Sequence, residues 1–347
     1  MNRTLALALL AACGGRPTTA PHAGPATVVT PAPATPRTLA LPGAPADGVF
    51  LDYIAYEPTH HRVWVPAGGT GKVDVIDART LEVTAIDGFA TKEIERRGQK
   101  RMMGPSAAAV GDGVVYIGNR GDSSVCAFDS GTLAKRSCAT LESTPDGIQY
   151  VASTKEIWVT TPRDKSIRIL DASSLAVKAG ITFAGEPEGF AVDEARGRFF
   201  TNLEDKDQTL VIDLVTHAVG DTWSPACGED GPKGLIFDAA TNHLLVVCPD
   251  HVETLDAAKG GVVIGKLAVG DGLDAIDYVP ARHQIVAAAG RAATLVVATL
   301  APDGSLTAAA QVATAKGARN AVMAEDGTMF VCDGPAGAIL VVPPPRP

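Results

Sequence analysis

The chain has 347 residues, longer than one ordinary hydrophobic core, so a barrel or a repeat architecture has to be considered. With 46% hydrophobic and 20% charged residues the composition is globular, and 36 glycines and 24 prolines favour tight turns over long helices. The formal net charge of −9 argues against a nucleic-acid-binding surface, because such a protein repels polyanions.

The N-terminus, residues 1–12, reads as an export signal. Arg3 precedes a short apolar run that cannot span a bilayer, and small residues follow it up to Cys13. The sequence Leu-Ala-Ala-Cys at residues 10–13 resembles a bacterial lipobox. That resemblance implies cleavage before Cys13, acylation of its thiol and a lipid-anchored protein of the bacterial cell envelope. An ordinary cleaved signal with an unrelated cysteine is the alternative. Gly14, in place of an aspartate, favours the outer membrane or periplasm.

Three further segments follow the signal. Residues 13–37 are rich in Pro, Ala and Thr, and we expect them to form an extended tether whose only role is to span a distance. Residues 38–343 carry the repeating pattern described next and are expected to form the folded domain. Residues 344–347 form a short tail.

A stretch at residues 185–219 shows the unit that the rest of the chain repeats. Its apolar runs, at residues 190–192, 199–202 and 210–212, are separated by charged turns and leave no room for a helix of three turns. Such a pattern predicts an antiparallel meander of short strands.

The second apolar run of this unit recurs along the chain. Anchored on an aromatic or aliphatic residue of each run, the spacing is about 41 to 46 residues after a first step of about 52. The runs are residues 63–65, 115–117, 157–159, 199–201, 244–246, 285–287 and 329–331. A period in the low forties built of short strands predicts an all-β, seven-bladed β-propeller with four antiparallel strands in each blade.

The third run of five units ends on an aspartate. These residues are Asp77, Asp129, Asp171, Asp213 and Asp256. Each can accept hydrogen bonds from the backbone of the following turn. Blades 6 and 7 lack the aspartate, so their turns should differ.

Two units carry a motif that is typical of a known family. Tyr-Ile-Gly-Asn at residues 116–119 and Phe-Phe-Thr-Asn at residues 199–202 each precede a strand that ends on Asp. The chain therefore resembles the YVTN family of bacterial seven-bladed β-propellers over residues 38–342. No WD40 or kelch pattern recurs.

The ring is expected to close through both ends of the domain. The last unit supplies only three strands, and residues 38–41 resemble the fourth strand of an internal blade. We therefore predict that residues 38–41 pair with residues 339–342, which removes two exposed sheet edges.

The strand order brings one set of loops to one mouth of the channel. In an antiparallel blade, the start of the first strand and the end of the second lie on the same face, so the charged residues there are candidate ligand- or partner-binding residues. They are Asn119, Arg120, Asp146, Arg163, Glu188, Asn202, Glu204, Lys233, Asp250, Asp274 and Arg319. They could form a pocket for a small anionic or zwitterionic ligand or a partner's loop, or they could be solvated loops joined by weak ion pairs.

Catalytic patterns are sparse. The seven histidines show no metal-ligand spacing, and neither a GxSxG elbow nor a CxxC pair occurs. Lactone-hydrolysing propellers of the gluconolactonase type hold a divalent metal at the channel, and Glu188, Asn119, Asn202 and Asp250 have suitable side chains for such a site. A quinoprotein oxidoreductase is disfavoured, because the chain has only three tryptophans.

A basic insertion, residues 92–101, accounts for the long first step of the repeat. It lies on the mouth side and is expected either to capture acidic groups or to be a solvated insertion or short helix.

Cysteines of an exported protein should pair. Cys126 with Cys138, and Cys227 with Cys248, fall on a common face of their blades, and we predict these two disulfides. Cys332 is left over, either buried and inert or an exposed thiol.

The sequence as a whole favours an envelope-tethered binding or scaffold module that acts as a monomer and requires no cofactor. Its partner would be an envelope protein or a small polar ligand, not nucleic acid. The alternative is a metal-assisted hydrolase with its site at the channel mouth.

Overall fold

The computed structural model describes residues 35–96 and 98–345. The expected signal peptide, the acylated Cys13, most of the tether and the end of the tail lie outside the described residues. Within the described part of the chain, no helix has the length and apolar character that crossing a bilayer requires.

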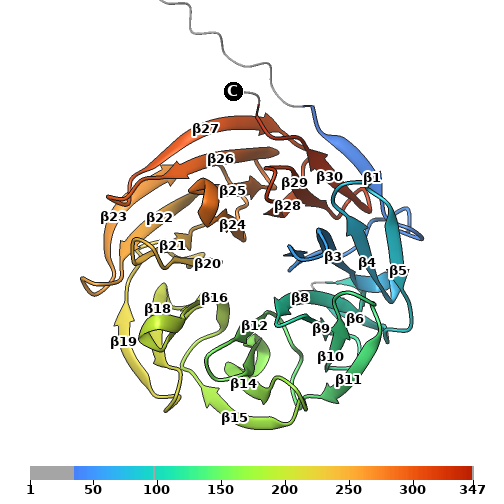
Figure 1. Cartoon of the computed structure of the whole chain (residues 1–347), viewed down its shortest axis with the longest axis horizontal. Coiled ribbons are helices and arrows are strands. Elements are labelled where there is room, and N and C mark those ends of the chain that lie inside the picture. Colours follow the sequence, from blue (N-terminus) through green and yellow to red (C-terminus); the bar gives the residue numbers. More distant parts are fainter. Residues whose placement is uncertain (1–34, 97, 346–347) are drawn as a thin grey trace, which may run out of the picture. The chain divides into compact units, whose positions relative to one another are not determined.

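Seven four-stranded antiparallel sheets, the blades, stand in a ring and confirm the predicted fold (Figure 1). Blades 1 and 2 are built from β2 (Ala55–Glu57), β3 (Arg62–Ala67), β4 (Lys72–Asp77) and β5 (Val83–Ile86), and from β8 (Pro105–Gly111), β9 (Val114–Asn119), β10 (Ser124–Asp129) and β11 (Lys135–Thr140). Blades 3 and 4 are built from β12 (Ile148–Val151), β13 (Glu156–Thr161), β14 (Ser166–Asp171) and β15 (Val177–Thr182), and from β16 (Pro187–Asp193), β17 (Arg198–Leu203), β18 (Gln208–Asp213) and β19 (Val219–Trp223).

Blades 5 to 7 complete the ring. Blades 5 and 6 are built from β20 (Leu235–Asp238), β21 (His243–Val247), β22 (His251–Asp256) and β23 (Val262–Ala268), and from β24 (Ile276–Val279), β25 (Gln284–Ala289), β26 (Thr294–Leu300) and β27 (Leu306–Ala313). Blade 7 contains β28 (Ala318–Met323), β29 (Met329–Asp333), β30 (Ala338–Val342) and, from the other end of the domain, β1 (Arg37–Ala40). The first strand of each blade lies innermost (Figure 1). The helices of the described residues are single 3-10 turns: η1 (Gly68–Thr70), η2 (Pro162–Asp164), η3 (Glu194–Arg196) and η4 (Pro280–Arg282).

The ring closes as predicted, through antiparallel pairing of β1 with β30. Thr38 faces Leu340 and Leu39 faces Ile339. The pairing begins one residue earlier than the sequence suggests, at Arg37, and Leu41 lies outside the strand. The Leu41 N–H still donates to the Gly337 carbonyl at 3.0 Å. The pairing covers the edge of β30 that would otherwise be open.

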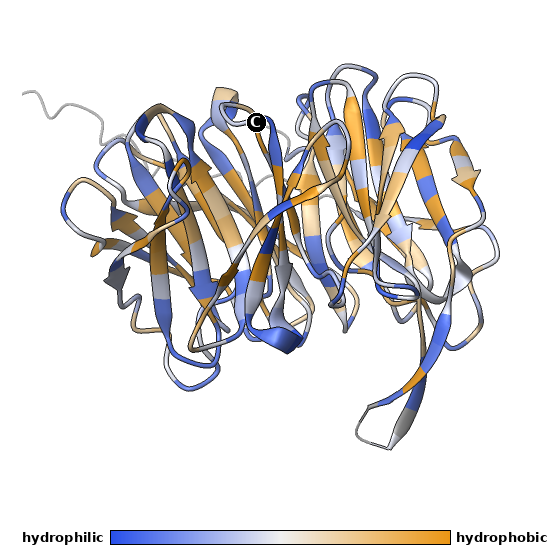
Figure 2. Ribbon diagram, turned by 90° about the horizontal axis from the view of Figure 1, so that it is seen from below, coloured by the Kyte–Doolittle hydropathy of each residue, from blue (hydrophilic) through white to orange (hydrophobic). Residues whose placement is uncertain are grey.

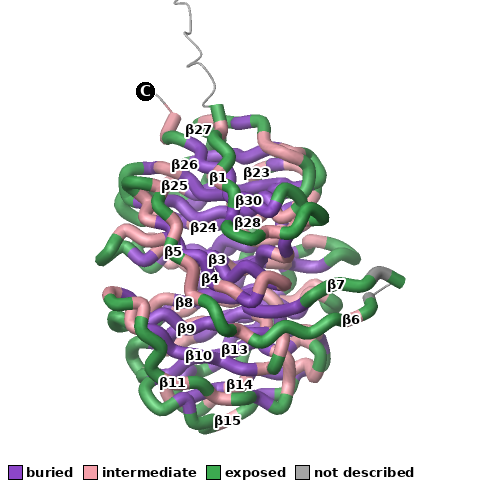
Figure 3. Tube along the Cα trace, turned by 90° about the vertical axis from the view of Figure 1, so that its right-hand side faces the viewer, coloured by how far each residue is buried: buried purple, intermediate pink, exposed green. Residues whose placement is uncertain are grey.

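The core lies between the blades. The described residues form seven clusters of buried apolar side chains, one at each contact between neighbouring blades. A middle strand such as β3 is therefore buried on both faces, and Val63, Trp64 and Val65 are all fully buried. Figure 2 shows the apolar stretches along the strands and hydrophilic residues in the loops, and Figure 3 shows the outer strands β1, β11 and β15 as largely exposed.

The aspartates at the ends of the third strands bind the turns that follow them. Asp171 Oδ1 accepts the backbone N–H groups of Ser173 and Ser174 at 3.1 and 2.8 Å. Asp129 does the same for Gly131 and Thr132. The prediction made from the repeat is confirmed, because one carboxylate satisfies two turn donors that the sheet leaves unpaired.

The basic insertion is a β-hairpin of β6 (Lys92–Arg96) and β7 (Gln99–Met103), so the expectation of a short helix is wrong. Gly98, with φ of 73°, allows the tight turn between the two strands. The hairpin projects away from the ring (Figure 3).

Both predicted disulfides are present. Cys126 and Cys138 face each other across β10 and β11, and Cys227 bonds to Cys248 in blade 5. Cys332 carries a free thiol that is buried in the core between blades 7 and 1, which decides between the two alternatives for this residue.

Candidate functional site

Loops that enter the first strands and leave the second strands meet around a cavity of about 900 Å³ at one end of the channel, called the mouth here. Eight of the eleven candidate residues line it. They are Arg120, Asp146, Arg163, Glu188, Glu204, Lys233, Asp274 and Arg319. They come from blades 2 to 7, so the antiparallel order of the strands, rather than closeness in sequence, brings them together.

Three candidates do not line this cavity. Asn119 and Asn202 are buried, and their oxygens accept hydrogen bonds from the Gly121 N–H at 2.9 Å and the Thr209 hydroxyl at 2.7 Å. Both asparagines therefore hold loops in place. Asp250 lies exposed at the edge of blade 5, beside His251.

Asp52 is a residue of the mouth that the sequence reasoning missed. It lies before β2, at the position that Asp146, Glu188 and Asp274 occupy before or at the start of the first strands of their own blades. Blade 1 differs most from the other units because its first strand is short, so the equivalence was not recognised. The shared Asp-x-Ile spacing with residues 146–148 was the available signal.

Arg120 joins three blades through one guanidinium. Its Nη2 donates to Asp52 of the first blade at 2.8 Å and to Asp146, which precedes β12 of the third. The guanidinium also lies over the Phe50 ring, 4.9 Å from its centroid. The two carboxylates raise the pKa of Arg120 further, against the opposing effect of its burial, so the side chain stays charged.

The two other cations at the centre of the mouth are also paired. Lys233 Nζ donates to the Glu204 carboxylate. Arg319 Nη1 lies 3.0 Å from Asp274 Oδ2, which also accepts from Asn320 Nδ2 at 3.0 Å. Their positive charge is therefore already matched by carboxylates of the protein.

Glu188 differs from the carboxylates that pair with the central cations of the mouth, which are Asp52, Asp146, Glu204 and Asp274. Among the residues that the structure describes, none forms a hydrogen bond or an ion pair with its side chain. Burial raises its pKa well above the ordinary value, and the nearby Asp146 and Asp274 raise it further. Among the described residues, both carboxylate oxygens of Glu188 are thus available to a ligand.

Proton affinity is raised across this part of the mouth. Burial raises the pKa of Asp52 to about 7, although Arg120 opposes the shift, and burial also raises the pKa of Asp146. Carboxylates gathered in a partly dehydrated site cannot all ionise at ordinary cost. Perturbed groups in a cleft are typical of functional sites.

Beyond the mouth the channel continues between the inner strands. A second cavity of about 250 Å³ is lined by the inner strands, with Ile54, Ile148 and Leu235 among its walls. The rings of Tyr53 and Phe190 stack at a centroid distance of 5.9 Å. The wall of this second cavity also contains Gln149, Asp277 and Asn320, so this part of the channel is of mixed polarity.

The hairpin of β6 and β7 forms one wall of the mouth. Lys92, Ile94, Glu95 and Met103 line the same cavity as Arg120. The expected location on the mouth side is therefore observed. Its capture of acidic groups stays a prediction.

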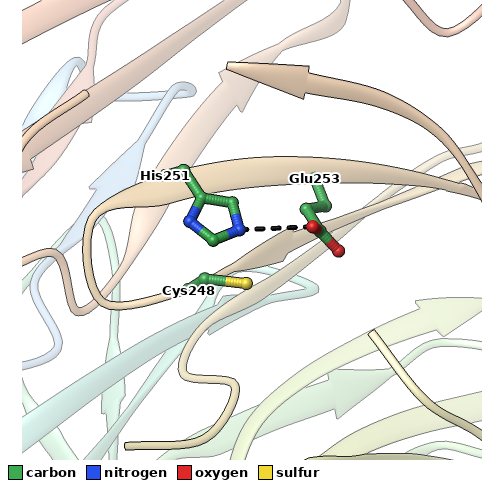
Figure 4. A group of neighbouring side chains, drawn as sticks. All are labelled: Cys248, His251 and Glu253. Carbon is green, nitrogen blue, oxygen red and sulfur yellow. Dashed lines mark hydrogen bonds and ion pairs between the residues drawn. The ribbon is translucent and has the colours of Figure 1, made fainter. Parts of the chain in front are cut away.

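The residues suggested for a metal-assisted hydrolase do not assemble as ligands. The oxygens of Asn119 and Asn202 are engaged, and Asp250 is absent from the wall of the mouth. In residues 35–96 and 98–345, the one group of three His, Cys, Asp or Glu ligand atoms that lie within 4.8 Å of one another is Cys248, His251 and Glu253 (Figure 4).

Solved structures of the same architecture exist, and their likeness to this chain shows the fold alone. A chain of the Mitotic Checkpoint Complex has 13% sequence identity and a TM-score of 0.74, with 99% of each chain covered. Kuenenia stuttgartiensis hydrazine synthase has 15% identity and a TM-score of 0.69, over 86% of this chain and 96% of that one. Virginiamycin B lyase from Staphylococcus aureus has 12% identity and a TM-score of 0.68, over 89% and 99%.

No protein-family model matches the sequence, and no curated protein matches it either. The class of protein is defined by the fold: an all-β, seven-bladed β-propeller, an architecture that commonly serves as a binding or scaffold module. This class includes complexes and enzymes alike, so function has to be argued from the site.

Proposed function

We propose that this propeller is an envelope-tethered binding module that takes a small zwitterionic ligand at its mouth, with the amine end on Glu188. The observation that carries the proposal is the Glu188 carboxyl, which has no partner within residues 35–96 and 98–345, in a cavity whose central cations are already paired. A ligand cation there would gain a charge-assisted hydrogen bond that no protein group supplies.

Charge at the rim favours a zwitterion over a simple amine. Arg163 lies exposed on the wall of the same cavity, in the loop after β13. An anionic group on the outer end of the ligand would face this guanidinium. An anion placed at the centre would instead have to compete with the carboxylates that hold Arg120 and Arg319.

Three matched probes test the ligand class: propylamine, β-alanine and propionate, with thermal unfolding as the readout. Binding to the native state raises the melting temperature. We expect β-alanine and propylamine to raise it and propionate to leave it unchanged. Arg163→Ala should weaken β-alanine binding alone. Stabilisation by propionate, or by none of the three probes, would overturn the proposal.

Glu188→Gln keeps the shape of the side chain and removes its charge, so it should abolish stabilisation by either amine. Glu186→Gln is the matched control, because Glu186 lines the same cavity from the same loop. Equal losses in the two variants would show that the general acidity of the loop, rather than Glu188, attracts the amine.

The tether and the family are part of the proposal and rest on the sequence. The lipobox-like residues 10–13 support a lipid anchor at Cys13, and the motifs at residues 116–119 and 199–202 support a place in the YVTN family. Cys13→Ser should move the protein from the membrane fraction to the soluble fraction of bacterial cells. Unchanged fractionation would contradict the anchor.

A further inference from the structure

We infer that blade 5 contains a zinc site that opens when the Cys227–Cys248 disulfide is reduced, with Cys227, Cys248, His251 and Glu253 as ligands. The site is separate from the mouth and belongs to the start of β22 and the loop before it. Figure 4 shows the imidazole and the carboxylate on this strand beside Cys248.

The strand geometry places the ligands together. His251 and Glu253 are two residues apart in β22, so both side chains project from the same face. The loop between β21 and β22 begins with Cys248, whose backbone N–H donates to the His251 carbonyl at 2.9 Å. One ligand atom from each of these three residues lies within 4.8 Å of the others. Ligand atoms of one tetrahedral zinc ion lie roughly 3.3–3.8 Å apart, so these three atoms are close to the spacing that zinc requires. The fourth ligand atom, Cys227 Sγ, is bonded to Cys248 Sγ in the oxidised protein.

His251 is oriented as a metal ligand. Its Nδ1 lies 2.5 Å from Asp250 Oδ1, and its Nε2 lies 3.2 Å from Glu253 Oε1. A neutral imidazole that donates its Nδ1 proton to Asp250 presents the Nε2 lone pair to the Glu253 carboxylate. A carboxylate behind a ligating imidazole is the usual supporting group of zinc sites.

Glu253 supplies the independent sign of a missing ligand. The residue is only 4% exposed, and its buried Oε2 has no hydrogen-bond partner among the residues that the structure describes. Lys266 reaches only the other oxygen, Oε1, at 3.5 Å. A buried carboxylate oxygen with no partner is costly, and a bound metal ion would remove that cost.

Reduction supplies the remaining ligands. A dithiol transfers two electrons and two protons to the Cys227–Cys248 bond, which breaks to give two thiols while the reductant closes its own disulfide. Zn²⁺ then displaces both thiol protons to solvent and binds the two thiolates, the Nε2 atom and a carboxylate oxygen. Two sulfurs, one nitrogen and one oxygen complete a four-coordinate site of the kind that zinc prefers.

The test compares oxidised and reduced protein. The full chain is reduced with a water-soluble phosphine, which takes up oxygen from water as the disulfide opens, and is then dialysed against Zn²⁺ or Co²⁺. We expect one zinc ion per reduced chain, none per oxidised chain, and thiolate-to-cobalt charge-transfer absorption in the reduced protein only. Equal zinc content in both states would overturn the inference.

Variants identify the ligands. His251→Gln and Glu253→Gln should each weaken zinc binding about 100-fold or more, and Asp250→Asn about 10–100-fold, because it orients His251. The double variant Cys126→Ser/Cys138→Ser should bind zinc as the wild type does. Asp74→Asn is a matched control for Glu253, because Asp74 is a buried carboxylate at the same position of the third strand in blade 1. Unchanged binding in His251→Gln and Glu253→Gln would overturn the assignment.

Cys227→Ser tests zinc binding without a reductant. It frees the Cys248 thiol while the other disulfide stays closed, and it leaves three protein ligands and a position for water. This variant should bind zinc without phosphine, more weakly than the reduced wild type. If reduction unfolds the whole chain, zinc binding by folded Cys227→Ser supports the inference, and failure to bind zinc contradicts it.

Discussion

Arg120, which follows the second strand of blade 2, donates to Asp52, which precedes the first strand of blade 1, at 2.8 Å in a largely buried ion pair. The same guanidinium reaches Asp146 of blade 3. One side chain therefore sets the spacing of three neighbouring blades at the mouth. A buried pair of this kind contributes little when intact, but losing one member leaves an uncompensated charge.

Arg120→Met should lower the free energy of unfolding by about 3–5 kcal/mol, because two buried carboxylates lose their cation. Arg291→Met is the matched control: its pair with Asp271 is exposed, and the loss should be below about 1 kcal/mol. Chemical denaturation of both variants measures the difference. Losses of similar size would contradict the role given to Arg120.

Amine binding should be linked to proton release. The raised pKa of Glu188 favours its protonated form, whereas a ligand cation favours the carboxylate, so affinity for propylamine should rise with pH while the amine stays protonated. Calorimetry in buffers of different ionisation enthalpy counts the released proton. Glu188→Gln should show no such release. An affinity that falls with rising pH would contradict the assignment.

Asp74 should make the protein less stable as the pH rises. Burial raises its pKa from 3.8 to about 6, and neither carboxylate oxygen has a hydrogen-bond partner in the described part of the chain. The folded state binds this proton more tightly than the unfolded chain, so the stabilisation is complete below 3.8 and is lost as the pH rises to about 6. The loss is about 2–3 kcal/mol.

Asp74→Asn should remove this loss of unfolding free energy with rising pH, as measured by denaturation across the same pH range. Asp303→Asn is the control, because the Ser305 hydroxyl lowers the pKa of this exposed carboxyl. Removing the Asp303 carboxylate should leave the loss of stability with rising pH unchanged. An unchanged pH profile in Asp74→Asn would show that other groups cause the dependence.

The turn aspartates should make the protein more stable, not less, as the pH rises. Hydrogen bonds from Ser174 and Ser173 lower the pKa of Asp171, so its contribution is present above 3.8 and is lost as the pH falls through the lowered value. Asp171→Ala should cost about 1 kcal/mol at neutral pH, because two turn donors lose their acceptor. The difference from wild type should shrink in acid, and thermal melts at several pH values would show whether it does.

Closure by β1 should be needed for stability. A chain that begins at Gly48 loses the pairing with β30, and we expect its melting temperature to fall by about 5 °C or more. A chain that begins at Pro36 keeps β1 and serves as the control. The shorter chain should also self-associate, since an uncovered strand edge invites pairing with another copy. Equal melting temperatures would rule out closure.

Much of the fold follows from local sequence pattern. Strands and turns recur with a regular period, and the turn after the third strand repeatedly has backbone N–H groups that need an acceptor. The number of blades and the turn aspartates could therefore be predicted. The disulfides could be predicted for the same reason, because a known strand order places Cys126 opposite Cys138. The hairpin at residues 92–103 could not, because it has no counterpart in the repeat.

The sequence by itself determined which loops reach the mouth, since strand direction within each repeat decides the face on which a loop lies. It brought eight of the eleven candidate residues there, but not Asn119, Asn202 or Asp250, and it missed Asp52. Only the tertiary structure decided how the residues of the mouth pair. Arg120 meets a residue 68 positions before it and another 26 positions after it. No local pattern encodes that choice, because it depends on how seven blades share one narrow opening. That arrangement pairs Arg120, Lys233 and Arg319 with carboxylates, and it leaves Glu188 without a partner among the described residues.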